Sequence, residues 1–98
     1  MKAFYKAIEN RIKSAGYPAY VSGQEIYEDI CDEIEDKENG SYLFMSKKDN
    51  DIYFEYKIDI MDDQFNLAYL IIHTPEQDWK VEFDWLKSKR RTMKDVSS

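Results

Sequence analysis

Residues 52–60 read IYFEYKIDI, and this stretch sets the class of fold. An apolar or aromatic side chain stands at every second position, and tyrosine, glutamate, lysine and aspartate stand between them. Side chains of a β-strand point alternately to the two faces of its sheet. The alternation therefore predicts a strand with one buried face and one solvent-facing side.

The same period of two continues on both sides of this stretch. It predicts further strands over residues 42–46, 65–73 and 79–85, separated by short polar turns. The last of these strands places Trp79, Val81, Phe83 and Trp85 on one face. Connections this short join antiparallel neighbours, so the four strands are expected to form a meander.

Two helices are expected before the strands. Residues 2–15 carry an apolar stripe at helical spacing, and Gly16 and Pro18 end it. Ser22 followed by Glu25 fits a capping box, which starts a second helix that we expect to end at Asn39-Gly40.

The sequence therefore predicts an α+β fold with two N-terminal helices packed on one face of a four-stranded antiparallel β-meander, in two layers. Residues 1–86 are expected to form a single domain, which suits a chain of 98 residues. Residues 87–98 are expected to form a basic C-terminal tail, either a short helix or disordered.

Cysteine and histidine usage argues against metal and redox chemistry. Cys31 is the single cysteine and His73 the single histidine, so they cannot build a Cys/His zinc site by themselves, and no cofactor is predicted. We interpret Cys31 as a core residue and His73 as a strand-end residue rather than as a nucleophile pair. The longest apolar run, residues 67–72, is too short to cross a bilayer, and the N-terminus does not resemble a signal peptide. A cytoplasmic protein without membrane contact is expected.

Charge is distributed very unevenly along the chain. Residues 15–84 carry 5 basic and 18 acidic residues, a net charge of −13, whereas residues 1–14 carry +3 and residues 85–98 carry +4. The acidic residues are densest on the second predicted helix. Such a face can be simply solvated, but carboxylates near a helix C-terminus oppose the macrodipole and are not explained by helix stability.

The leading hypothesis is a non-enzymatic binding protein that engages a basic surface of a protein partner. A helical row of carboxylates could occupy a cleft that binds nucleic acid, and direct nucleic-acid binding is not expected from a chain with a net charge of −6. In size and charge the chain resembles small acidic nucleic-acid mimics of phages and mobile elements, which implies an inhibitor of a nucleic-acid-processing enzyme. A monomer or a homodimer fits equally well. The predicted partner-binding residues are Glu28, Asp29, Asp32, Glu33, Glu35 and Asp36.

Two alternatives stay open. A small accessory or subunit domain would bind through a hydrophobic sheet edge or an aromatic patch, with Tyr53 and Trp85 as candidates. A Mg²⁺-dependent nuclease would use Glu55 and Lys57 as an E-x-K strand motif, with an aspartate from residues 49–51.

Overall fold

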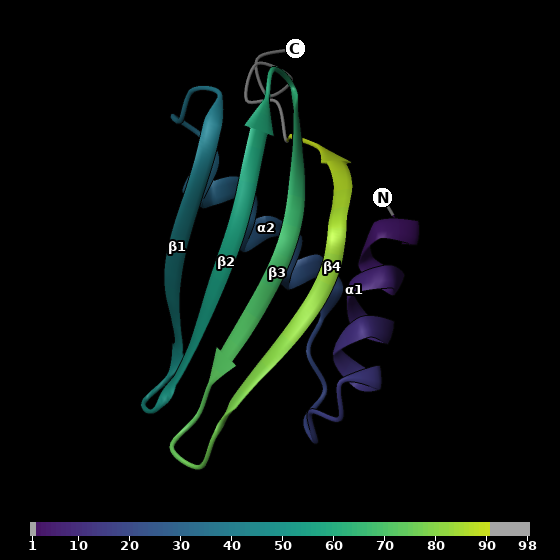
Figure 1. Cartoon of the computed structure of the whole chain (residues 1–98), viewed down its shortest axis with the longest axis vertical. Helices are drawn as coiled ribbons and strands as arrows, with labels where there is room; N and C mark the ends of the chain where they lie inside the picture. Colours follow the sequence, from purple (N-terminus) through teal and green to yellow (C-terminus); the bar gives the residue numbers. More distant parts are fainter. Residues whose placement is uncertain (1, 91–98) are drawn as a thin grey trace.

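The predicted meander is present in the computed structural model, which describes residues 2–90 (Figure 1). The elements are α1 (Lys2–Ser14), α2 (Gly23–Ile34), β1 (Gly40–Asp49), β2 (Ile52–Met61), β3 (Gln64–His73) and β4 (Asp78–Lys89). The strands lie in the order β1-β2-β3-β4, and each neighbouring pair is antiparallel. The predicted fold class is therefore confirmed.

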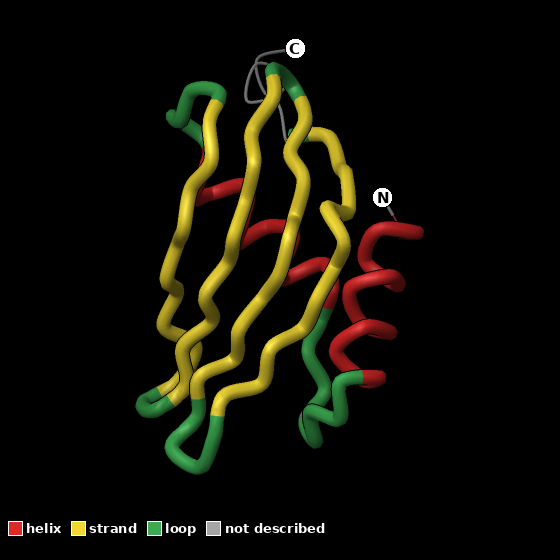
Figure 2. Tube along the Cα trace, viewed as in Figure 1, coloured by secondary structure: helices red, strands yellow, loops and turns green. Residues whose placement is uncertain are grey.

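The two helices lie on one side of the sheet. Figures 1 and 2 show α2 crossing behind all four strands and α1 beside β4. Between the layers lies a core to which each element contributes at its own period, for example Ile8 and Ile12 from α1, Ile30 from α2 and Tyr56 and Leu70 from the sheet. Burying each such side chain contributes about 1.5–3 kcal/mol, so the core is the main source of stability.

The two helices meet closely at Gly23, the first residue of α2. A Cβ atom placed on Gly23 would lie 2.2 Å from the backbone oxygen of Tyr5, so only glycine fits here. The Gly23 N–H donates to Glu9 Oε2 on α1 at 2.8 Å, and the Ser22 hydroxyl accepts from the Glu25 N–H as the capping box predicts. The carboxylate of Glu9 thus satisfies one of the N–H groups that every helix start leaves unpaired.

Helix α2 ends earlier than the sequence predicted. The expected end was Asn39-Gly40, but the last helical residue is Ile34, with Glu35 as the C-cap. The Arg90 guanidinium donates hydrogen bonds to the carbonyl oxygens of Ile34 and Lys37. It thereby satisfies carbonyl groups that the end of the helix leaves without an intrahelical partner. Strand β1 spans Gly40–Asp49 and is thus longer at both ends than the predicted residues 42–46.

Strand β4 departs from regular alternation. Asp84 and Trp85 both have positive φ, 54° and 60°, and the register with β3 shifts between Leu67 and Tyr69. The prediction that Trp85 shares the buried face of Val81 is therefore wrong, because two left-handed residues rotate it outward and leave it 51% exposed.

Strand β4 also continues to Lys89, past the predicted domain boundary at residue 86. Residues 87–89 are strand rather than the predicted helical or disordered tail. Arg90 follows the strand and contacts the end of α2, and residues 91–98 of the predicted tail lie outside the described residues.

The two edges of the sheet differ. Helix α1 lies along β4, and Arg11 donates to the backbone oxygen of Glu82 at 2.9 Å. Beyond β1 no further element lies among residues 2–90 (Figure 1). No helix in this part of the chain is long and apolar enough to span a bilayer.

Candidate functional site

Helix α2 has one apolar and one acidic face. Ile26, Ile30 and Ile34 are buried against the sheet. Of the six carboxylates predicted as partner-binding residues, Glu28, Asp32, Glu35 and Asp36 are exposed. Glu33 is half-buried beside the apolar face. Five of the six predicted residues thus present carboxylates to solvent fully or in part.

Asp29 lies in a different environment from the other five. Its Oδ2 accepts from Lys48 Nζ at 2.8 Å and from the Tyr56 hydroxyl at 2.7 Å, and its side chain is 18% exposed. Burial by itself raises the pKa of Asp29, but hydrogen bonds from Lys48, Tyr56 and Ser46 outweigh it and hold the pKa below its usual value. Burial and the same carboxylate raise the pKa of Tyr56 far above its usual range. Asp29 therefore fastens α2 to β1 and β2. Because its carboxylate is bound within the fold, it does not belong to the binding face.

The C-terminal end of α2 is capped by Arg90. The Arg90 guanidinium donates to the carbonyl oxygens of Ile34 at 2.6 Å, Lys37 at 3.1 Å and Asp62 at 3.1 Å. A cation at this position offsets the negative end of the helix dipole. It thereby reduces the electrostatic cost of the carboxylates nearby. On the same side of the molecule, Lys37 Nζ lies 3.8 Å from Asp36 Oδ1, a long ion pair between exposed groups.

A second cluster of charged side chains lies on the uncovered face of the sheet. His73 Nε2 is 2.9 Å from Glu55 Oε1, and His73 Nδ1 is 3.0 Å from Asp78 Oδ1, so one imidazole links β2, β3 and β4. The hydrogen bond to Glu55 raises the pKa of His73, partial burial opposes it, and the bond to Asp78 adds to the rise. Sequence reasoning missed this cluster, because it depends on a strand register that no local motif specifies.

The raised pKa of His73 makes part of the stability pH-dependent. The imidazolium is favoured in the folded state, so its contribution is complete below the unfolded pKa of about 6.5 and is lost as the pH rises through the folded pKa. We expect His73→Gln to lower the thermal midpoint at about pH 5.5 and to have a smaller effect at about pH 9. Since His73 is the single histidine, an NMR titration reports it directly. An NMR pKa at or below 6.5 would contradict the prediction.

The other chemical candidates do not assemble into a site. Glu55 faces His73, while Asp49 and Asp51 lie at the β1–β2 turn, in a different cross-strand row. Residues 2–90 contain no group of three or more His, Cys, Asp or Glu side chains that could hold a metal ion. Cys31 is buried on α2, whereas His73 lies on the outer face of the sheet.

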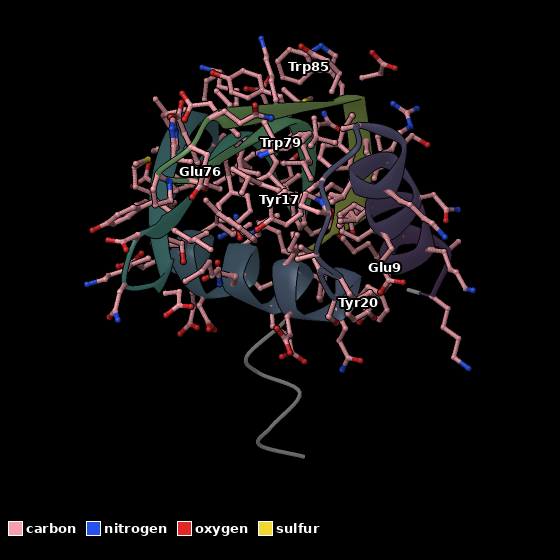
Figure 3. The ribbon with its side chains drawn as sticks, turned by 90° about the horizontal axis from the view of Figure 1, so that it is seen from below. Glu9, Tyr17, Tyr20, Glu76, Trp79 and Trp85 are labelled. Atoms are coloured by element: carbon pink, nitrogen blue, oxygen red, sulfur yellow. The ribbon has the colours of Figure 1, made fainter. Side chains whose placement is uncertain are left out.

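Open hollows surround the connection between the two helices. One of about 400 Å³ lies between this connection, α2 and β2, and is lined by Tyr20, Ile26, Lys48 and Phe54 among others. Figure 3 shows Tyr20 beside Glu9, to which its hydroxyl donates at 3.1 Å, and Tyr17 near Trp79. These aromatic side chains fasten the connection, and the hollow is lined by the polar residues Ser22, Glu25, Lys48 and Asp49 as well as by apolar ones.

No protein-family model, curated protein or solved structure matches this chain. The surface of residues 2–90 has two distinctive features, the acidic face of α2 and the edge of β1.

Proposed function

We propose that this is a non-enzymatic binding protein that engages a basic surface on a protein partner through the acidic face of α2. That face consists of Glu28, Asp32 and Glu33 on the helix, and of Glu35 and Asp36 in the turn directly after it. The observation that carries the proposal is the exposure of Glu28, Asp32, Glu35 and Asp36 on and beside a helix whose two ends are fixed by Glu9 and Arg90. A fixed row of charges is preorganised, so little conformational entropy is lost on binding.

The partner class that fits best is a nucleic-acid-binding protein. Residues four apart on a helix, such as Glu28 and Asp32, lie about 6 Å apart along its axis, and Glu35 and Asp36 add negative charge directly after the helix end. Clefts that bind nucleic acid are lined with lysine and arginine and gain affinity by neutralising phosphates. An acidic helix bound in such a cleft would act as a nucleic-acid mimic. It would inhibit the enzyme because it occupies the site where the nucleic acid binds. Its association rate and affinity would fall steeply with salt.

The test reverses two charges at the C-terminal end of the face. We expect Asp32→Lys/Asp36→Lys to weaken capture of the partner from a cell lysate by about two orders of magnitude, since like charges then face each other in the complex. Lysine in the last turn of a helix or directly after it is favourable, so the fold should persist. Double-stranded DNA added as competitor should release the captured partner, because it needs the same cleft.

The matched control places the same charge change elsewhere. Asp51→Lys/Glu76→Lys alters two exposed carboxylates at the β1–β2 and β3–β4 turns and should bind as the wild type does. Both variants are checked for folding by circular dichroism. Equal capture by the α2 variant and the wild type at low salt would exclude the acidic face as the binding site.

The accessory-domain alternative predicts the opposite salt dependence. Binding through an apolar patch would be nearly indifferent to salt and sensitive to Trp85→Ala or Tyr53→Ala, whose side chains are 51% and 37% exposed. Figure 3 places Trp85 on the side of the sheet away from α2, so the two hypotheses concern separate surfaces. The salt series of the capture experiment therefore distinguishes them.

A further inference from the structure

The edge strand β1 carries four consecutive apolar or aromatic residues, Tyr42 to Met45. Leu43 and Met45 point to the uncovered face and are 56% and 54% exposed. Tyr42 and Phe44 point to the helix side, where they are half-buried and their rings stack with centroids 5.7 Å apart. Both faces of this edge therefore present apolar surface to solvent.

Such an edge is a pairing surface. A strand at the edge of a sheet presents unpaired N–H and C=O groups, and proteins protect such edges by charges, proline, bulges or a covering element. At β4 this protection is provided by α1 and Arg11. Residues 41–46 of β1 contain neither proline nor charge.

Features at both ends limit the regular part of the edge to residues 41–47. Gly40 has a φ of +150°, and the register with β2 shifts between Lys47 and Asp49. The midpoint of this seven-residue stretch is Phe44. A two-fold axis at Phe44 would therefore align the whole regular stretch with its own copy in antiparallel register.

We infer that β1 pairs with β1 of a second copy of this chain, in antiparallel register about Phe44, so that two four-stranded sheets become one sheet of eight strands. In this register Leu43 lies directly opposite Met45 of the second copy, and the contact occurs twice. On the helix side, Phe44 meets Phe44 and Tyr42 meets Ser46. Apolar residues thus meet apolar residues on the uncovered face, and on the helix side they do so at Phe44.

Charge complementarity favours the same occupant. Lys47 falls opposite Ser41 of the second copy, and the Ser41 hydroxyl donates to Asp59 on β2. Each lysine is thereby brought near an aspartate of the other copy, and no like charges face each other between residues 41 and 47. A shift of two residues would lose this arrangement, because Lys47 would face Leu43 or leave the paired stretch.

The test measures mass in solution by light scattering at increasing protein concentration. We expect the wild type to move from one chain of 11.8 kDa to two as its concentration rises from about micromolar to about millimolar. Leu43→Lys/Met45→Lys should raise the dimer dissociation constant by about a hundredfold, because two lysine pairs then face each other. Leu43→Glu/Met45→Lys should dimerise again, because each glutamate then lies opposite a lysine.

Met61→Lys is the matched control. Met61 is 63% exposed at the far end of β2, and this variant should dimerise as the wild type does. Circular dichroism verifies that each variant is folded. Three results would each overturn the inference: a single-chain mass for the wild type at every concentration, a dimer that persists in Leu43→Lys/Met45→Lys, or a monomeric Leu43→Glu/Met45→Lys.

Discussion

Gly23→Ala is expected to lower the free energy of unfolding by more than about 3 kcal/mol, a large fraction of the about 5–15 kcal/mol typical of a single domain. The new Cβ would lie 2.2 Å from the backbone oxygen of Tyr5 and 2.7 Å from its backbone carbon atoms. Backbone atoms cannot rotate away as a side chain can, so α1 and α2 would have to separate. Alanine has the higher helix propensity, but this gain is at most about 1 kcal/mol and does not offset the clash. Chemical denaturation of both proteins measures the difference.

Gly16→Ala separates steric crowding from backbone strain. Gly16 has a φ of +93°, but a Cβ there would meet only Trp79 at an ordinary 3.5 Å. We expect this variant to lose about 1–2 kcal/mol, the cost of a left-handed non-glycine residue. An unfolding midpoint of Gly23→Ala equal to that of the wild type, or a larger loss in Gly16→Ala, would show that the helices do not depend on this close approach.

Local patterns predicted most of the fold. The alternation in residues 52–60 and the capping box at Ser22 each depend on residues a few positions apart, and the structure confirms the strand and the cap. The outward rotation of Trp85 was not predictable in this way. It depends on two residues with positive φ and on Arg11, which lies more than 70 positions away and pairs with Asp84 at 3.4 Å.

The candidate site was predictable only in part, for the same physical reason. Helical spacing indicates which carboxylates point away from Ile30, and Glu28 and Asp32 follow that pattern. Spacing could not show that Lys48 and Tyr56 would converge on Asp29, because both belong to strands whose placement under α2 is decided by the tertiary fold. The His73 cluster likewise required the register of three strands.

Arg90→Ala is expected to lower the free energy of unfolding by about 2–4 kcal/mol. Its guanidinium joins the carbonyl oxygens at the end of α2 to that of Asp62 in the β2–β3 turn, and charge-assisted hydrogen bonds contribute about 1.5–3 kcal/mol each when desolvated. Arg90 is only half-buried, so its hydrogen bonds together contribute less than the full value for desolvated groups. Chemical denaturation measures the loss, and hydrogen exchange should show faster exchange in the last turn of α2.

Arg90→Lys and Lys89→Ala distinguish the fork of hydrogen bonds from simple charge. Lysine at position 90 keeps the positive charge near the helix end but cannot reach carbonyls on two segments at once, so we expect it to recover only the dipole interaction, about 0.3–1 kcal/mol. Lys89 is exposed, and it accepts from Tyr27 through its backbone oxygen, which alanine retains. Lys89→Ala should therefore unfold like the wild type. If Arg90→Lys were as stable as the wild type, the positive charge alone would account for the contribution of Arg90. The end of α2 would then be stabilised by electrostatic attraction rather than by hydrogen bonds to its carbonyl oxygens.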